Sequence, residues 1–211
     1  MYTDDMHTDF FAAVLAGGRS SRMGRDKRFL MWNQELLLDR AIRLASEVLG
    51  VQPNQVYLCG DVPGRVSLPD TIPKIGPLGG LWSALRQARR FARSNSDPWL
   101  LVLPVDMPLL DHEILMGLLA EAKKGNPDES LAIAYQDFEM PFILRCGELS
   151  EKIIEKICLE NPSSLRSIRV YFEKLSVRRI PSQSFHGKLA SNLNFPSDVR
   201  ACFHLEVLNE S

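Results

Sequence analysis

Short apolar runs alternate with longer helical patterns through the first half of the chain, and this alternation limits the fold more than any other feature. Apolar runs at residues 11–16, 55–59 and 99–105 predict strands. Between them, apolar stripes at helical spacing predict helices over 34–49 and 78–92. Strands separated by helices pair in parallel through right-handed crossovers, with helices on both faces. The sequence therefore predicts a three-layer α/β fold around a mostly parallel, Rossmann-like sheet.

The second half of the chain alternates less regularly. Asp111 is expected to cap a helix that runs to residue 124, because an aspartate can accept a hydrogen bond from a first helical turn. The other elements are predicted as strands at 131–135, 140–146 and Val177–Ile180, with a turn around Asp137, and as helices at 149–159, 164–174 and 196–203. No internal repeat or linker divides the sequence.

The composition is that of an ordinary globular protein, with 45% hydrophobic and 24% charged residues. A length of 211 residues suits one substantial domain, so we expect a single domain over 1–211, with 1–9 as a disordered N-terminal extension. The formal net charge of −1 gives no general attraction to nucleic acid or to an anionic membrane. Neither is expected as a partner, and any phosphate-binding charge must be local.

The cysteines and histidines form no recognisable framework. Cys59, Cys146, Cys158 and Cys202 are widely spaced without a C-x-x-C pair, which favours buried thiols in a reducing compartment. The four histidines are scattered, which gives little support to a Ser-His-Asp or zinc-peptidase site. No apolar stretch approaches the ~20 residues that span a bilayer, and the acidic N-terminus is unlike a secretory signal. These features predict a cytoplasmic enzyme.

A glycine-rich turn follows the first predicted strand, in the segment VLAGGRSSRMGRDK at residues 14–27. Gly17 and Gly18 let the backbone approach an anion, and Arg22 and Lys27 bring positive charge to the place where phosphates would lie. The segment fits neither the Walker A pattern nor the dinucleotide fingerprint, because its glycines are adjacent. The alternative for Arg22 and Lys27 is that they are solvated surface cations.

Asp106 directly follows the most apolar run in the chain, in the stretch LPVDMP. Ligands of parallel sheets bind outside the carboxyl ends of the strands, so this carboxylate and the glycine-rich turn are expected at one edge. Mg²⁺ is usually held by one or two carboxylates together with substrate phosphates. Asp106 is therefore the predicted metal ligand. The alternative is that this aspartate caps the next turn.

The segment at 15–27 resembles the signature L-A-G-G-x-S-x-R-M-G-x-D-K of the molybdenum cofactor guanylyltransferases, and every fixed position is met. These enzymes belong to the nucleotidyltransferase superfamily, which includes the sugar-nucleotide pyrophosphorylases. The resemblance implies transfer of GMP from GTP to the phosphate of molybdopterin, with release of pyrophosphate and Mg²⁺ as cofactor. It also implies molybdoenzymes or their chaperones as further partners.

The resemblance implies roles for particular residues. Arg22, Lys27 and Asp106 would be catalytic, and Asp26 would orient the loop rather than bind metal. The segment GPLGG at 76–80 resembles another family element, with Asp70 upstream as the matching guanosine-binding aspartate. The implied nucleotide-binding residues are Leu15, Ala16, Gly17, Gly18, Lys27, Asp70, Gly79 and Asp106, and the implied acceptor-binding residues are Asn192 and Asn194 in NLNFPSD at 192–198.

Several alternatives remain open at this point. Gly79 and Gly80 could admit a base or ribose, or could serve tight packing of a helix on a strand, and the two asparagines could be turn formers. Cys59 stands where the family commonly has a guanine-reading asparagine, so CTP or another acceptor is the rival substrate. A nucleotide-binding regulatory domain without turnover is the rival class. Phe142 and Arg145 are weaker candidates for the acceptor side.

Overall fold

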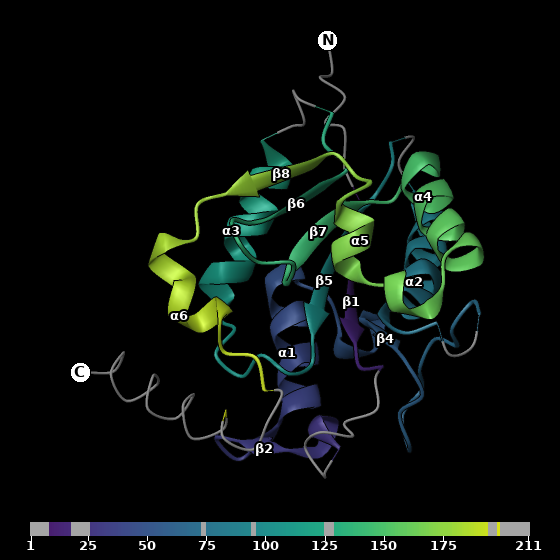
Figure 1. Cartoon of the computed structure of the whole chain (residues 1–211). Coiled ribbons are helices and arrows are strands. Elements are labelled where there is room, and N and C mark those ends of the chain that lie inside the picture. Colours follow the sequence, from purple (N-terminus) through teal and green to yellow (C-terminus); the bar gives the residue numbers. More distant parts are fainter. Residues whose placement is uncertain are drawn as a thin grey trace.

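One six-stranded sheet runs through the molecule (Figure 1). The computed structural model describes residues 9–17, 26–72, 75–93, 96–124, 129–193 and 198. The strands lie in the order β4-β1-β5-β7-β6-β8. Their bounds are β1 Phe10–Leu15, β4 Tyr57–Cys59, β5 Trp99–Pro104, β6 Ala132–Tyr135, β7 Phe142–Arg145 and β8 Val177–Ile180. Only β7 runs against the other strands of this sheet, which confirms the mostly parallel sheet.

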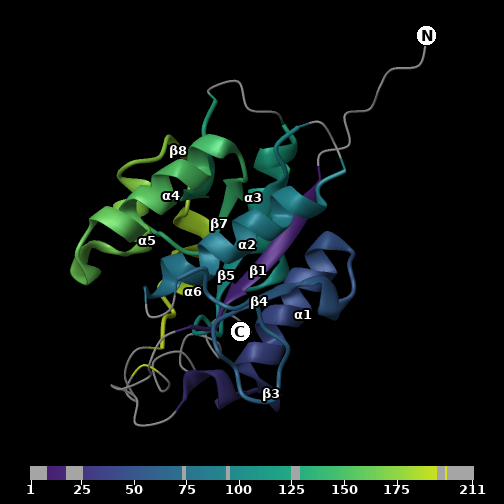
Figure 2. The ribbon, with the colours of Figure 1, turned by 90° about the vertical axis from the view of Figure 1, so that its right-hand side faces the viewer.

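Helices cover both faces of the sheet, as the alternation of elements predicted (Figure 2). Helices α1 (Leu37–Leu49) and α3 (His112–Lys123) pack on one face. Helix α2 (Pro77–Phe91) packs on the other face, with α4 (Glu148–Glu160) and α5 (Ile168–Phe172) beside it. A short helix, α6 (His186–Leu189), follows β8. The fold is therefore the predicted three-layer α/β arrangement.

The central strands are apolar throughout because both of their faces are buried. In β1, Ala12 and Val14 face the core beneath α1 and α3, whereas Ala13 and Leu15 face the core beneath α2. Successive side chains of a strand point to opposite faces, so one continuous apolar run fills both layers. β5 repeats this alternation.

The prediction for residues 34–49 was wrong at its start. Helix α1 begins at Leu37, because Asn33 and Gln34 both adopt positive φ angles in a two-residue turn. This turn joins the short strands β2 (Met31–Trp32) and β3 (Glu35–Leu36) into a hairpin. Positive φ at both central positions is the geometry of a tight hairpin turn, which asparagine tolerates well. Similarly, β4 starts at Tyr57 because Pro53–Gln55 forms a 3₁₀ turn.

The second half follows the predicted pattern with shifted boundaries. The side chain of Asp111 accepts a hydrogen bond from Ile114 N at 3.0 Å, which confirms it as the cap of α3. The turn between β6 and β7 contains Asp137 with φ +66°. The helix predicted over 164–174 is shorter, because a 3₁₀ turn at Ser163–Leu165 precedes α5. The helix predicted over 196–203 lies outside the described residues, apart from residue 198.

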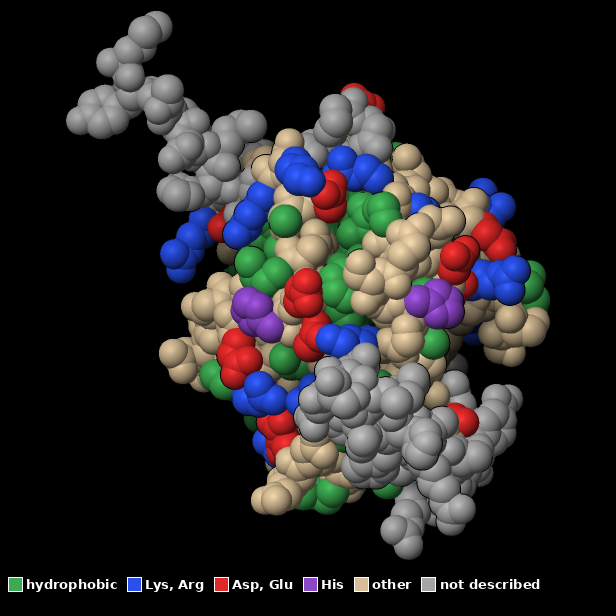
Figure 3. Space-filling view, turned by 90° about the vertical axis from the view of Figure 1, so that its left-hand side faces the viewer, with side chains coloured by type: hydrophobic (Ala, Val, Ile, Leu, Met, Phe, Trp, Pro, Cys, Tyr) green, Lys and Arg blue, Asp and Glu red, His purple; other side chains and the backbone are tan. Residues whose placement is uncertain are grey.

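Asp9, the last residue of the predicted N-terminal extension, is tied to the sheet. Its carbonyl accepts a hydrogen bond from Trp99 N at 2.9 Å. Residues 1–8 lie outside the described part. Among the helices that are described, none is long and apolar enough to cross a membrane. On the face drawn in Figure 3, the described Lys and Arg side chains are interspersed with Asp and Glu side chains.

Candidate active site

The register of β1 on β5 brings the glycine-rich turn and Asp106 to one edge of the sheet. Leu15 lies opposite Pro104 in the parallel ladder, and both strands point to the same end of the molecule (Figure 1). Gly17 and Asp106 each lie two residues beyond this last pair. The structure therefore confirms that the two segments meet at the carboxyl ends of the strands, where ligands of such sheets bind.

A pocket of about 290 Å³ opens at this edge. Its walls come from seven separate segments of the sequence. The lining residues are Leu15, Ala16, Gly17, Lys27, Arg28, Pro77, Pro104, Val105, Asp106, Met140, Ile168 and Asn192. Half of these residues were predicted as site residues from the sequence.

Lys27 and Asp106 form an ion pair across this pocket. The distance from Lys27 Nζ to Asp106 Oδ2 is 3.0 Å, and the two side chains are only 14% and 21% exposed. Lys27 is therefore not a solvated surface cation. Partial burial strengthens the attraction between the charges relative to water. In this arrangement the lysine neutralises the carboxylate, and both groups stay within reach of a ligand in the pocket.

Asp26 and Arg28 fix the backbone that carries Lys27. Asp26 caps the 3₁₀ turn at Lys27–Phe29 through a hydrogen bond from Arg28 N at 3.1 Å. The Arg28 guanidinium donates to both carboxylate oxygens of Asp26 and also to the carbonyl of Asp61, beyond β4. These hydrogen bonds from Arg28 lower the pKa of Asp26. Asp26 therefore holds the turn that carries Lys27, whereas residues 18–25 of the loop lie outside the described residues.

Gly60 packs the backbone beyond β4 against Gly17. Its φ is +109°, and a Cβ atom built there would lie 2.7 Å from Gly17 N and 2.8 Å from Gly17 Cα. Only glycine suits both this backbone angle and this close approach. Gly60 is not itself a lining residue of the pocket, but it sets the position of one of its walls.

The segment after α6 returns to the pocket and places Asn192 there. Leu193 N donates a hydrogen bond of 2.8 Å to the carbonyl of Asp106. Lys188, in α6 just before this segment, places its Nζ 2.5 Å from Asp111 Oδ2 and ties α6 to the start of α3. Asn192 therefore lines the same pocket as Asp106, and its role toward the acceptor stays a prediction. Its predicted companion Asn194 lies outside the described residues, as do Gly18 and Arg22.

Asp70 and Gly79 do not line the pocket of Lys27 and Asp106. Asp70 packs against the first turn of α2, where a Cβ built on Gly79 would lie 3.2 Å from Asp70 Cγ. Burial raises the pKa of the Asp70 carboxyl group. The carboxylate borders a second pocket, of about 480 Å³, farther along α2. A Cβ on Gly80 would lie 2.7 Å from Cys59 Cβ, so tight packing of the helix on the strand accounts for Gly80.

Cys59 is 1% exposed and belongs to the core beneath α2. Burial raises the pKa of its thiol to about 12, whereas an unfolded thiol titrates near ~8.5. The reactive thiolate is thus scarce in the native protein at pH 8. We expect iodoacetamide to label Cys59 slowly at pH 8 without denaturant and rapidly in urea, as measured by peptide mass spectrometry. Stability should also fall as the pH rises above ~9, because the unfolded thiol loses its proton first.

The prediction that Phe142 and Arg145 line the acceptor side was wrong. Phe142 is fully buried, and its ring packs edge-to-face on Phe172 with the centroids 5.0 Å apart. Arg145 pairs in register with the first residue of β5, and its Nε lies 3.8 Å from Asp97 Oδ2. Because β7 runs antiparallel to β5, its carboxyl end lies at the opposite end of the sheet from the pocket.

Six lining residues were not predicted as site residues: Arg28, Pro77, Pro104, Val105, Met140 and Ile168. Arg28 could have been suspected, since it directly follows Lys27, the last residue of the signature. Pro77 is the first residue of α2, so the positive end of that helix borders the pocket. Met140 and Ile168 belong to no sequence motif. Only the tertiary fold brings their segments to the pocket, so the sequence could not indicate them.

The donor set of the pocket fits a magnesium ion that enters with a nucleotide. The carboxylate of Asp106 and the side-chain amide of Asn192 are oxygen ligands of the kind that Mg²⁺ prefers. Within the described ranges, no three His, Cys, Asp or Glu residues come together as a self-sufficient metal site. Phosphate oxygens of a substrate would have to complete the coordination, as is usual for Mg²⁺.

A three-layer α/β fold that brings a glycine, a lysine and an aspartate together at its strand ends is the arrangement expected of a nucleotidyltransferase. The chain belongs to the MobA-like NTP transferase domain family, which matches residues 12–175.

Its relatives share both sequence and fold. The chain is 33% identical over 191 residues to the molybdenum cofactor guanylyltransferase of Xanthomonas euvesicatoria, covering 90% of this chain and 93% of that relative. It is 31% identical over 200 residues to the enzyme of the same name from Rhizobium meliloti, covering 90% and 88%. The crystal structure of molybdopterin-guanine dinucleotide biosynthesis protein A from Archaeoglobus fulgidus superposes with a TM-score of 0.66 at 20% identity, covering 96% of this chain and all of that one. At this identity, the structural similarity is evidence for the fold alone.

Proposed function

We propose that this protein transfers GMP from GTP to the phosphate of molybdopterin and releases pyrophosphate, with Mg²⁺ as cofactor. The observation that carries the proposal is the Lys27–Asp106 pair in the pocket between the ends of β1 and β5. The names of the relatives that match nine tenths of the chain supply the substrates.

In the proposed reaction, a phosphate oxygen of molybdopterin attacks the α-phosphorus of GTP. The bond between the α-phosphorus and the oxygen that bridges to the β-phosphorus breaks, and this oxygen leaves with pyrophosphate. The attacking phosphate is largely ionised at neutral pH, so the reaction needs no strong general base. Catalysis then rests on positioning the reactants and on neutralising charge, as in other phosphoryl transfers.

Lys27 is the residue proposed to bind the triphosphate. Its ammonium group would turn from Asp106 toward the phosphates and would leave the carboxylate free for the metal. The N-terminal end of α2 adds a fixed positive potential at Pro77. Asp106 would hold Mg²⁺, which, when bound, supplies positive charge to the phosphate oxygens. Arg22 and Gly18 are proposed to bind the same triphosphate, because both belong to the family signature.

The remaining roles divide between nucleoside and acceptor. Asp70 with Gly79, at the first turn of α2, is proposed to hold the guanosine. Asn192 lies on the pocket wall beside Asp106 and is proposed to face molybdopterin, together with Asn194. Cys59 is buried and does not line the pocket, so the choice of base is assigned to other groups.

The test is to measure pyrophosphate release with GTP, CTP, ATP and UTP, each with and without molybdopterin and Mg²⁺. Release that requires GTP, molybdopterin and Mg²⁺ together is the expected result. Release with CTP alone would overturn the choice of guanine. If no nucleotide gave release with any phosphorylated acceptor, the protein would be a nucleotide-binding domain without turnover.

A further inference from the structure

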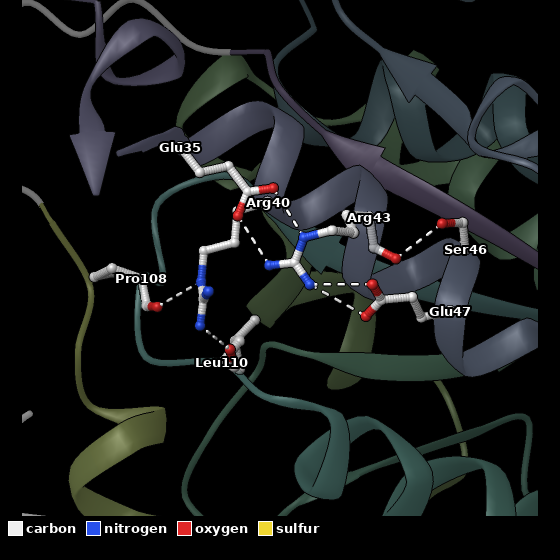
Figure 4. Close-up of polar contacts among 7 residues, drawn as sticks. All are labelled: Glu35, Arg40, Arg43, Ser46, Glu47, Pro108 and Leu110. Atoms are coloured by element: carbon white, nitrogen blue, oxygen red, sulfur yellow. Dashed lines mark hydrogen bonds and ion pairs between the residues drawn. The ribbon is translucent and has the colours of Figure 1, made fainter. Parts of the chain in front are cut away.

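Arg40 of α1 binds the loop that follows Asp106, as Figure 4 shows. Its Nε donates to the carbonyl of Pro108 at 2.9 Å, and its Nη2 donates to the carbonyl of Leu110 at 3.0 Å. The planar guanidinium thus spans two backbone acceptors two residues apart, a geometry that suits arginine and not lysine. A partly buried, charged donor makes such bonds stronger than those between neutral groups.

The loop held by Arg40 carries the proposed metal ligand at its beginning. Asp106 is two residues before Pro108, and the loop closes with a hydrogen bond from Leu110 N to Met107 O at 3.3 Å. The side chains of Met107, Leu109 and Leu110 are buried beneath it. Arg40 therefore fixes the backbone carbonyls of a turn whose apolar side chains are held by the core.

The first turn of α1 also anchors the segment that carries Lys27. Leu37 N donates to the carbonyl of Leu30 at 2.9 Å, and Leu30 N donates to the carbonyl of Lys27 at 3.1 Å. Arg40 is three residues after Leu37, so it comes from the next turn of the same helix. One rigid element thus contacts the backbone on both sides of the Lys27–Asp106 pair.

We propose that Arg40 is a positioning residue that holds Asp106 at its working distance from Lys27. Arg40 does not line the pocket, so it acts on the metal and the substrate only through the Asp106 loop. The inference rests on the proposed function, because it takes Asp106 as the metal ligand. Residues that orient a metal ligand typically change metal affinity by about 10- to 100-fold when they are replaced.

Arg43 provides the matched control, since it lies one turn along the same helix and is also in Figure 4. Its guanidinium binds Glu35 at 2.8 Å and Glu47 at 3.1 Å, away from the Asp106 loop. Arg43→Met removes an arginine and its ion pairs from α1 but leaves the loop contacts intact. Arg40→Met removes the loop contacts, and Arg40→Lys keeps the charge without the two-pronged geometry.

The experiment compares these variants in the full chain by three measurements. We expect Arg40→Met to weaken Mn²⁺ binding to the protein–GTP complex by about tenfold or more. Electron paramagnetic resonance of Mn²⁺ measures this binding. The Mg²⁺ concentration for half-maximal pyrophosphate release should rise in parallel, with the KM for GTP changed less than about twofold. Hydrogen exchange of the amides at 106–111 should quicken in Arg40→Met but not in Arg43→Met.

Arg40→Lys should show the same changes to a smaller degree, and it serves in place of Arg40→Met if that variant does not fold. Equal Mn²⁺ affinity and equal loop exchange in the Arg40 and Arg43 variants would overturn the proposal. If the wild-type protein failed to transfer GMP, the proposed function would fall, whereas Mn²⁺ binding and exchange would still decide the role of Arg40.

Discussion

Replacing Asp106 by asparagine is expected to slow pyrophosphate release by about 100- to 1,000-fold, as is usual when one group that stabilises the transition state electrostatically is lost. The variant keeps the carbonyl of residue 106, which accepts the hydrogen bond from Leu193, so the backbone around the pocket should stay in place. An amide cannot provide the negative charge that attracts a divalent cation. Release at saturating GTP, molybdopterin and Mg²⁺ measures the effect.

The same substitution should not weaken the binding of GTP in the absence of metal. Asparagine removes the charge that Lys27 faces at 3.0 Å, and this frees the ammonium group for the phosphates. Calorimetric titration with GTP in EDTA tests this point. Asp39→Asn, which breaks a surface ion pair with Arg65, is the control and should leave both measurements unchanged. If Asp106→Asn turned over as fast as the wild-type protein, Asp106 would not be the metal ligand.

The part of the fold that positions the site could be predicted because it depends on local patterns. The strand ending at Leu15 and the strand ending at Pro104 are continuous apolar runs, and the helix between them begins at a proline that follows a glycine. Parallel pairing follows from strand–helix alternation. Parallel strands end at the same edge of a sheet, so Gly17 and Asp106 must lie at one edge. The meeting of the glycine-rich turn and Asp106 therefore follows from the apolar runs and the helix between them.

The rest of the site depends on contacts between segments without periodic signals. Ile168 reaches the pocket from the start of α5, which belongs to the stretch of sequence with the fewest recognisable motifs. Arg145 was misplaced because the sequence does not show that β7 runs antiparallel. Asp70 was expected to bind the guanosine, but the sequence does not show that its carboxylate packs against Gly79 in the first turn of α2. Arg40 has no sequence signal of its own, because it is one of two arginines on an amphipathic helix and only the fold brings the loop after β5 against it.

Gly60→Ala is expected to have the largest effect on the fold around the site. A methyl group there would lie within 2.8 Å of the Gly17 backbone, at a φ of +109° that side chains rarely adopt. Strain and overpacking should together lower the free energy of unfolding by about 2–4 kcal/mol. Because the displaced backbone is a wall of the pocket, the affinity for GTP should fall by about tenfold or more.

Gly64→Ala is the matched control, since Gly64 also has a positive φ, of +74°, but no atom of the described residues lies within 4 Å of the added methyl group. It should cost only ~1 kcal/mol of stability and leave GTP binding unchanged. Chemical denaturation and calorimetric titration of both variants would separate backbone strain from the steric contact, and equal GTP affinity in the two would show that Gly60 does not set the position of the glycine-rich turn.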